Sequence, residues 1–153
     1  MQTKKIVIVG PAQIGKSHLV SLLTNQGQQV NFFGQPVPNN VYVPTLGVEV
    51  VPLYYQNVCY NLWDCSGNPQ FSGLGSGYYI EADGLLCLRE FGKNDDTTSN
   101  KVVDFQIKNP GKQIVTIWLN QQGLNAINVV DAANGDLCYS NVNQIPINIL
   151  ESF

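Results

Sequence analysis

The sequence predicts an α/β domain with a mostly parallel sheet that carries helices on both faces. Continuous apolar runs at residues 5–9, 84–88 and 114–119 (KIVIV, GLLCL and IVTIWL) are typical of strands buried on both sides. Segments of helical periodicity alternate with these runs. The loop GPAQIGKS joins the first run to the first helical segment. A chain of 153 residues is also a usual length for one domain, so we expect residues 1–153 to form a single unit.

The first half of the chain predicts one helix and one hairpin beside the first strand. Leucine and valine recur at helical spacing between residues 19 and 23, which indicates a short helix from Lys16 to the turn residues at 25–27. Strand-like runs at residues 48–55 and 57–63 are separated by a tight polar turn. This pattern favours an antiparallel hairpin.

The second half predicts further alternating elements. Thr98 or Ser99 could cap a helix that the sequence NPG at residues 109–111 would end. After the central strand at 114–119, we expect a short strand at residues 127–130 and a last helix over residues 141–153.

The loop Gly10–Ser17 carries the strongest motif in the chain, GxxxxGK[ST]. Its glycines let backbone amides turn inward, and the helix N-terminus adds positive potential that favours phosphate. We expect Lys16 to neutralise the β- and γ-phosphates and the Ser17 hydroxyl to bind Mg²⁺. A strand before the loop and a helix after it argue against a chance Gly/Lys turn. The expected phosphate-binding residues of this stretch are Gly10, Ala12, Gln13, Ile14, Gly15, Lys16, Ser17 and, through its backbone amide, His18.

Two later segments have the residues that a nucleotide-dependent switch needs. Thr45 precedes a predicted strand in PTLGVEV, and Asp64 ends one in WDCSGNPQF, followed by Gly67. In such a switch a threonine hydroxyl binds Mg²⁺ only while the γ-phosphate is present, an aspartate holds the ion from the other side, and a glycine amide contacts the γ-phosphate. Taken alone, Thr45 fits a plain strand residue and Asp64 a turn residue. Together with the loop, they predict Ser17, Thr45 and Asp64 as metal ligands.

These motifs resemble those of the Ras superfamily of small GTPases, and within it the Ran family of nuclear-transport GTPases. The stretches YVPTLGVEVVPL and FSGLGSGYYIEADG are close to the two switch regions of Ran, and the similarity covers residues 4–90 before it weakens. The resemblance implies a P-loop NTPase fold of the small-GTPase type that binds GTP and GDP with Mg²⁺. It also implies the phosphate and metal roles given above for the loop, Thr45, Asp64 and Gly67.

The catalytic position departs from the family pattern. The resemblance assigns catalysis to Lys16 and to the residue after DxxG, where the family has glutamine and this chain has Asn68. Asparagine is one methylene shorter, and a misplacement of about 1 Å can cost on the order of 10²-fold in rate. Ala12 and Gln13 replace small glycines and would crowd an arginine supplied by a partner. We therefore expect slow or absent hydrolysis, unless a neighbouring side chain such as Gln70 orients the water.

The base site departs further. The family reads guanine with N-K-x-D, and at the matching strand end this chain has Asn120, Gln121 and Gly123 in NQQG. A second family motif, Ser-Ala-Lys, aligns loosely with residues 131–133, which makes Ala132 a candidate beside Asn120 and Gln121. A hydrogen bond to a charged group contributes about 1.5–3 kcal/mol, so loss of the aspartate should weaken the preference for guanine.

Spacing predicts that the fold is trimmed on the base side. Only six residues lie between Asn120 and Ile127, fewer than the dozen or so that a parallel crossover needs, so we expect the fourth helix of the family fold to be missing. The segment at residues 27–40, by contrast, is longer than in relatives. Its polar residues and prolines predict an extended surface loop.

Composition excludes several function classes. A net charge of −3 gives no basic footprint for nucleic acid, and no apolar run is long enough to cross a bilayer. The spacing of the four cysteines fits free thiols in a reducing compartment rather than zinc ligands. We expect a monomer in the cytoplasm and nucleus, and the Asn-rich, shortened sequence suggests a divergent, virus-encoded copy that would act in the host cell.

The sequence is consistent with three classes of function. The first is a Ran-like switch that binds GTP or GDP with Mg²⁺ and acts on importin-β-type transport receptors or Ran regulators. The second is a pseudo-GTPase that mimics the Ran surface as a decoy. The third is a P-loop ATPase or small kinase, against which the segments WDCSGNPQF and PTLGVEV argue.

Overall fold

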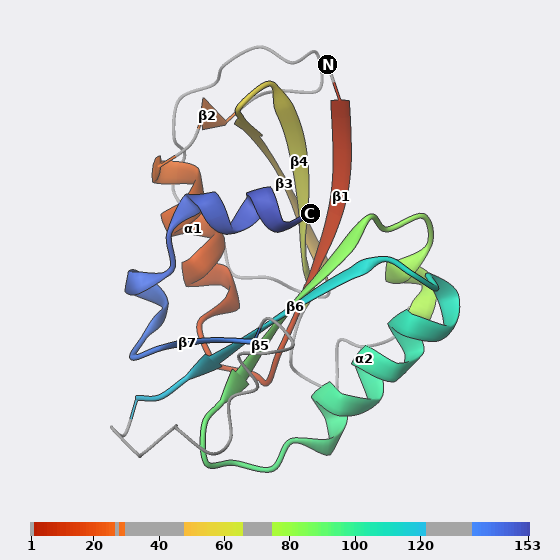
Figure 1. Ribbon diagram of the computed structural model, residues 1–153, viewed down its shortest axis with the longest axis vertical. Coiled ribbons are helices and arrows are strands. Elements are labelled where there is room, and N and C mark those ends of the chain that lie inside the picture. The colour runs from red at the N-terminus through yellow and green to blue at the C-terminus, as the bar shows by residue number, and fades with distance from the viewer. Residues whose placement is uncertain (1, 27, 30–47, 66–74, 122–135) are drawn as a thin grey trace.

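A computed structural model describes residues 2–26, 28–29, 48–65, 75–121 and 136–153. These residues contain a seven-stranded sheet in the order β2-β3-β4-β1-β5-β6-β7 (Figure 1). The strands are β1 (Gln2–Val9), β2 (Gln28–Gln29), β3 (Val48–Tyr55), β4 (Val58–Cys65), β5 (Gly84–Glu90), β6 (Gln113–Leu119) and β7 (Leu137–Tyr139).

The sheet is mostly parallel, as predicted. Parallel pairing joins β1 to β4 and to β5, then β5 to β6 and β6 to β7. The hairpin of β3 and β4 is antiparallel, and β2 adds to β3 in the same sense. The turn of the hairpin places Gln56 and Asn57 at φ of 49° and 63°, the conformation that two-residue hairpin turns favour. Within the segment predicted as a surface loop, Gln28 and Gln29 form the edge strand β2; residues 27 and 30–40 lie outside the described residues.

Helices cover both faces of the sheet, which confirms the predicted architecture. The helix α1 (Lys16–Gln26) lies on one face together with two 3₁₀ helices, η4 (Val142–Gln144) and η5 (Ile147–Ser152) (Figure 1). The helix α2 (Asp96–Lys108) and the 3₁₀ helix η2 (Gly75–Tyr79) pack against the other face.

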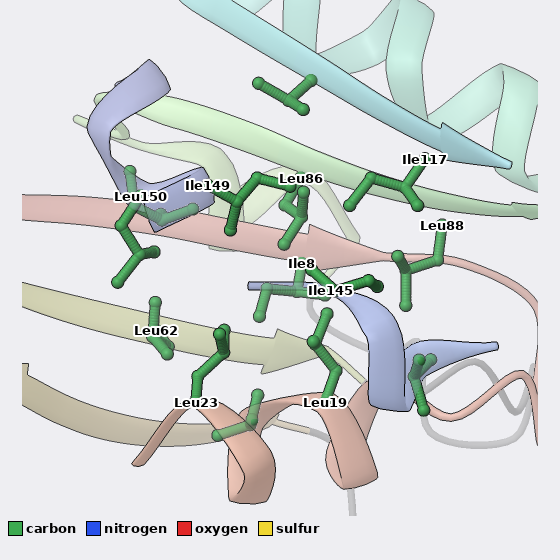
Figure 2. Close-up of a cluster of buried hydrophobic side chains, with 14 of the residues drawn as sticks. Ile8, Leu19, Leu23, Leu62, Leu86, Leu88, Ile117, Ile145, Ile149 and Leu150 are labelled. Carbon is green, nitrogen blue, oxygen red and sulfur yellow. The ribbon is translucent and has the colours of Figure 1, made fainter. Parts of the chain in front are cut away.

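The alternation of side chains along β1 explains why it lies at the centre. Residues Ile6 to Val9 are at most 1% exposed. Ile6 and Ile8 join the cluster under α1, and Val7 and Val9 join the cluster that contains Phe105 of α2. The first cluster includes a group drawn in Figure 2: Ile8, Leu19, Leu23, Leu62, Leu86, Leu88, Ile117, Ile145, Ile149 and Leu150.

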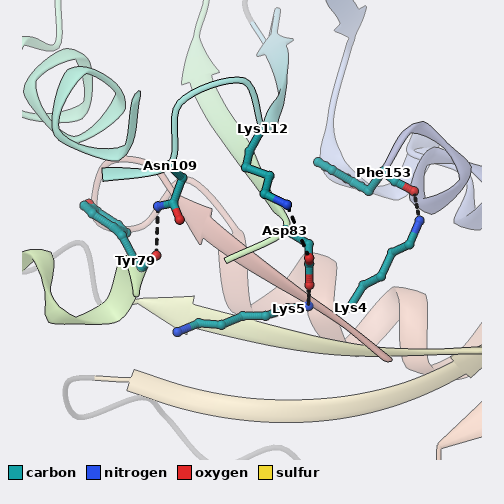
Figure 3. A network of polar contacts seen from close by, with 7 residues as sticks. All are labelled: Lys4, Lys5, Tyr79, Asp83, Asn109, Lys112 and Phe153. Atoms are coloured by element: carbon teal, nitrogen blue, oxygen red, sulfur yellow. Dashed lines mark hydrogen bonds and ion pairs between the residues drawn. The ribbon is translucent and has the colours of Figure 1, made fainter. Parts of the chain in front are cut away.

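The cap of α2 differs from the prediction. Asp95, not Thr98 or Ser99, is the N-cap, and its carboxylate accepts hydrogen bonds from the backbone amide and the hydroxyl of Thr98. A carboxylate is a better match than a hydroxyl for the positive end of the helix. Asn109 ends the helix, as the NPG sequence predicted, and its side-chain amide donates to the Tyr79 carbonyl (Figure 3).

The C-terminal elements also differ from the prediction. The expected α-helix over residues 141–153 is wrong in type, because two 3₁₀ helices occupy this range. Pro146 separates them: it has no backbone N–H, and it holds the preceding Ile145 in an extended conformation (φ −73°, ψ 117°). Both 3₁₀ helices still bury apolar side chains on the sheet.

The position of the last strand, β7, changes the number of residues that connect it to β6. Residues 127–130, where a strand was expected, lie outside the described residues, and β7 pairs parallel with β6 at residues 137–139. The connection from β6 to β7 spans residues 120–136, which is long enough for a parallel crossover. The reason given for a missing fourth helix was therefore wrong. The absence itself concerns residues 122–135, which lie outside the described residues, and stays a prediction.

A polar network lies near the amino ends of the central strands (Figure 3). The Asp83 carboxylate accepts a hydrogen bond from the Lys5 backbone amide at 2.8 Å and faces Lys112 Nζ at 3.9 Å. Lys4 Nζ donates to the Phe153 carbonyl. The Phe153 ring lies directly over Gly84, where a Cβ would overlap it. These contacts attach the C-terminal residues to the start of β1 and β5.

The cysteines Cys59, Cys65, Cys87 and Cys138 are free thiols, as their spacing predicted. Within the described part of the chain, no helix is both long and apolar enough to span a bilayer.

Candidate functional site

The loop between β1 and α1 has the bent backbone that its motif predicted. Gln13 and Gly15 have φ of 64° and 109°. The Ile14 amide donates to the Pro11 carbonyl at 3.4 Å, and the Leu19 amide donates to Gly15 at 2.8 Å, which begins the hydrogen bonds of α1. Positive φ suits Gly15 and strains Gln13, because a side chain disfavours this region.

Gly10 is required for a different reason, the close approach of β5. A Cβ at Gly10 would lie 2.9 Å from the Leu88 carbonyl oxygen and 3.3 Å from Ile14 Cγ2. The first glycine of the motif therefore lets the chain leave β1 against its neighbouring strand. The last, Gly15, allows the turn into the helix.

Lys16 points into the loop rather than into solvent. It is 6% exposed, and its Nζ donates to the carbonyls of Gly10 at 3.0 Å and Pro11 at 2.9 Å. Burial lowers the pKa of Lys16, and the Asp64 carboxylate opposes this effect by favouring the charged form. A cation is thus held at the centre of the loop, where a phosphate would be neutralised.

Ser17 and Asp64 come together at the carboxyl edge of the sheet. Ser17 Oγ donates to Asp64 Oδ2 at 2.5 Å, and Asp64 is 1% exposed. Asp64 pairs with Ile8 in the parallel register of β1 and β4, so it ends its strand beside the start of the loop. Burial, followed by the nearby Asp64 charge, raises the pKa of Cys65 to about 12, which keeps this neighbouring thiol neutral.

The donor set fits Mg²⁺. A hydroxyl and a carboxylate are hard oxygen ligands, and Mg²⁺ in proteins is held by one or two carboxylates with substrate phosphates and water. Within the described residues no group of three or more His, Cys, Asp or Glu side chains could hold a metal by itself. The pair Ser17–Asp64 therefore suits a metal that arrives with a phosphate ligand.

Several predicted site residues lie outside the described residues. These are Thr45, Gly67, Asn68, Gln70 and Ala132. Their metal, phosphate, catalytic and base roles stay predictions. The described residues Lys16, Ser17 and Asp64, in contrast, are brought into one cluster.

The C-terminal elements lie beside the end of β6 and the start of α1. The Asn120 backbone amide donates to the Tyr139 carbonyl at 2.8 Å, so the end of β6 is joined to the end of β7. The loop that follows β7 leads directly into η4, which contacts α1. His18 Nε2 lies 2.9 Å from Asn143 Oδ1, and Val142 packs against Gly15. The sequence analysis did not predict this contact of η4, and residues 131–133, the expected neighbours of the base, lie outside the described residues.

A pocket of about 500 Å³ is lined in part by the phosphate loop. It is bounded by the phosphate loop, by the connection from β5 to α2, and by Gln121 after β6. The lining residues are Pro11, Ala12, Gln13, Ile14, Glu90, Lys93, Asn94, Asp95 and Gln121. Crevices at the carboxyl ends of parallel strands are the usual ligand sites of such sheets.

Arg89 has a structural position near this pocket. Its Nη2 donates to Ser99 Oγ at 2.7 Å and to the Asp95 carbonyl at 3.3 Å, and its guanidinium lies 5.3 Å from the Trp118 ring centroid. These contacts join the end of β5 to the start of α2.

Comparison with known families agrees with this geometry. Residues 5–122, more than three quarters of the chain, match the family described as "Ras of Complex, Roc, domain of DAPkinase". The match includes β1 from Lys5 onward, the phosphate loop, Asp64 and the strand end at Asn120 and Gln121. The Roc family is a branch of the Ras-like GTPases, which bind guanine nucleotide with Mg²⁺. The chain belongs to the Roc family of Ras-superfamily GTPase domains.

Proposed function

We propose that this GTPase domain binds GTP and GDP with Mg²⁺ at the loop Gly10–Ser17 and works as a slow nucleotide-dependent switch. The observation that supports it most strongly is the cluster of Lys16, Ser17 and Asp64. A buried cation lies in the loop, and beside it the half-buried Ser17 hydroxyl donates to the buried Asp64 carboxylate. Together these groups have the charges that a triphosphate and its metal require.

Each described residue has a defined part in this binding. The Lys16 ammonium neutralises phosphate charge, and the amides at the start of α1 donate hydrogen bonds to phosphate oxygens. Ser17 Oγ and the Asp64 carboxylate are the protein ligands available to Mg²⁺, which supplies further neutralisation of the phosphates when bound. Because Lys16 and Asp64 are buried and Ser17 is hydrogen-bonded to Asp64, these groups are already held in place before the nucleotide arrives.

Slow hydrolysis follows from the residues near the reacting phosphate. Asn68 is one methylene shorter than the family glutamine, so its amide would orient the attacking water poorly. Gln13 lines the pocket beside the loop and adds a side chain where relatives have glycine. A partner's arginine would meet this side chain.

Weakened guanine preference follows from the end of β6. Gln121 and Gly123 stand where the family has lysine and aspartate. Gly123 has no side chain to accept the two ring hydrogen bonds of guanine that the family aspartate accepts, and the Gln121 carboxamide lacks the charge and the long apolar stem of lysine. The expected outcome is phosphate affinity with reduced base selectivity.

The cellular role is inferred from the resemblance to Ran. Switch stretches close to those of Ran support binding to importin-β-type transport receptors or Ran regulators, in the cytoplasm and nucleus. The runner-up is a pseudo-GTPase that presents the same surface as a decoy without nucleotide exchange. The changed positions Asn68, Gln121 and Gly123 are what favour this second candidate.

The test is the nucleotide content of the purified protein, followed by competition. The protein is denatured, and the released material is separated by anion exchange. Bound GDP or GTP near one per chain supports the switch. An empty protein that also takes up no GTP with Mg²⁺ supports the decoy. In competition, similar retention of ATP and GTP is expected; a preference for GTP on the order of a thousandfold would refute the weakened base site.

A further inference from the structure

The back of the phosphate loop is covered by a residue from the far end of the chain. Gly15 has no side chain, and the methyl groups of Val142 fill the adjacent space. Val142 Cγ1 and Cγ2 lie 3.2 and 3.5 Å from the position that a Cβ of Gly15 would take. Val142 is 7% exposed, so this contact is part of the protein interior.

A polar contact lies next to this apolar one. His18 Nε2 and Asn143 Oδ1 are 2.9 Å apart on the surface. Asn143 directly follows Val142, and His18 lies three residues after Gly15. His18 is in the first turn of α1, directly after the residues predicted to bind phosphate and metal. The two contacts therefore hold the last glycine of the loop and the first turn of the helix against η4.

The turn that carries Val142 and Asn143 is itself well supported. The Asn141 side chain accepts a hydrogen bond from the Asn143 amide at 3.0 Å, and the Ile145 amide donates to the Val142 carbonyl at 3.2 Å. Gln144 Oε1 accepts from the Ser140 amide at 2.9 Å. These hydrogen bonds within residues 140–145 hold the turn in one conformation, so Val142 and Asn143 have fixed positions against the loop.

The turn also continues from β7, whose Tyr139 carbonyl accepts from the Asn120 amide. Asn120 is the surviving residue of the expected base motif. Val142 and Asn143 of this turn, called the clamp below, thus join two parts of the candidate site that are far apart in sequence, the phosphate loop and the end of β6.

We propose that Val142 and Asn143 are positioning residues that hold the phosphate loop in its binding conformation and slow nucleotide release. The inference rests on the proposed function, because it assigns these residues to the same site. Its physical basis is the loop backbone: Gln13 is strained at φ 64°, so the loop needs outside contacts to keep its shape. Without the clamp, the loop samples other conformations, and a nucleotide leaves more often.

The test compares substitutions within one C-terminal segment. Val142→Ala removes the apolar contact with Gly15, and Asn143→Ala removes the polar contact at an exposed position. Ile149→Ala is the matched control, because Ile149 is 4% exposed in the same core cluster but belongs to η5. Release of a fluorescent GDP analogue, with Mg²⁺ and excess GDP, is followed by stopped flow. Unfolding in urea gives the stability of each variant.

We expect both clamp substitutions to speed release by about two- to thirtyfold, the range of couplings carried by contacts outside a binding site. Ile149→Ala should reduce stability at least as much as Val142→Ala and leave the release rate within about twofold of wild type. Val142→Thr keeps the shape of valine at a cost in stability from its buried hydroxyl, and should restore slow release. Equal acceleration by the control, or none by the clamp variants, would overturn the proposal.

A second readout needs no nucleotide. Amide hydrogen exchange at Lys16–Leu19 is measured by mass spectrometry on nucleotide-free protein. We expect faster exchange in Val142→Ala than in wild type and no such change in Ile149→Ala. Unchanged exchange in Val142→Ala refutes the clamp even if nucleotide binds. A wild-type protein that binds no nucleotide but shows the selective exchange change refutes the proposed function and keeps the positioning role.

Discussion

Removing the charge of Lys16 should abolish most of the nucleotide affinity. Lys16→Met keeps the length and apolar stem of the side chain and deletes only the ammonium group. In the structure that group makes two hydrogen bonds to loop carbonyls and lies close enough to Asp64 for the carboxylate to affect its pKa. It is therefore directed into the loop that is proposed to bind the phosphates.

The expected size of the effect follows from those bonds. A hydrogen bond to a charged group contributes about 1.5–3 kcal/mol. If the ammonium makes two such bonds to phosphate, as it now does to the loop, its loss costs about 3–6 kcal/mol. This corresponds to an increase in Kd of roughly 10²- to 10⁴-fold.

The assay is titration calorimetry with GDP and Mg²⁺, after circular dichroism confirms that the variant folds. Lys108→Met is the matched control, because Lys108 pairs with Asp104 on the surface of α2 at 3.7 Å, with 36% of its side chain exposed. Its affinity for GDP should equal that of wild type. An unchanged Kd for Lys16→Met would mean that the loop is not the binding site, and the reasoning from burial and charge would fail.

Two further predictions concern stability. Gly84→Ala should destabilise the protein by about 1–3 kcal/mol in urea unfolding, because the new methyl overlaps the ring of Phe153. Gly77→Ala, which meets no atom within 4 Å, should cause no such loss, and equal losses in both variants would contradict the overlap. The second prediction concerns the N-cap of α2, Asp95, and how its contribution to stability depends on pH. Its burial would raise its pKa, but hydrogen bonds from Thr98 outweigh this and hold the pKa below its usual value. Its contribution is therefore present above about pH 4 and lost as pH falls through the lowered pKa. Asp95→Asn, an equally good cap without the charge, should match wild type at pH 7 within about 1 kcal/mol and lose less stability on acidification; an identical acid loss in both proteins would argue against the ionised cap.

Much of the fold could be predicted because its elements have strong local signals. The strands β1, β5 and β6 are long apolar runs, and the hairpin of β3 and β4 carries a polar turn between two such runs. The weaker elements were missed. The strand β7 has only three residues, and its pairing with β6 is what makes it a strand. No pattern within so short a segment distinguishes it from a loop.

The described part of the candidate site was predicted for a related reason. Ser17 and Asp64 are 47 positions apart, yet Ser17 follows β1 by way of the phosphate loop and Asp64 lies at the carboxyl end of β4. The carboxyl ends of parallel strands lie at one edge of a sheet. Strand order alone therefore brings them close. The contact between His18 and Asn143, at a separation of 125 positions, follows from no such rule. It depends on how the C-terminal turn packs against α1.

The sequence by itself determined the phosphate loop, because eight consecutive residues between a strand and a helix define its backbone and place a lysine inside it. The positions of its glycines and its lysine can be read from these eight residues alone. Only the tertiary structure decided which distant residues support the loop from behind. Val142, Asn143 and the C-terminal 3₁₀ helices have weak conformational preferences of their own, and they take their places because the apolar face of the sheet beside α1 has to be covered.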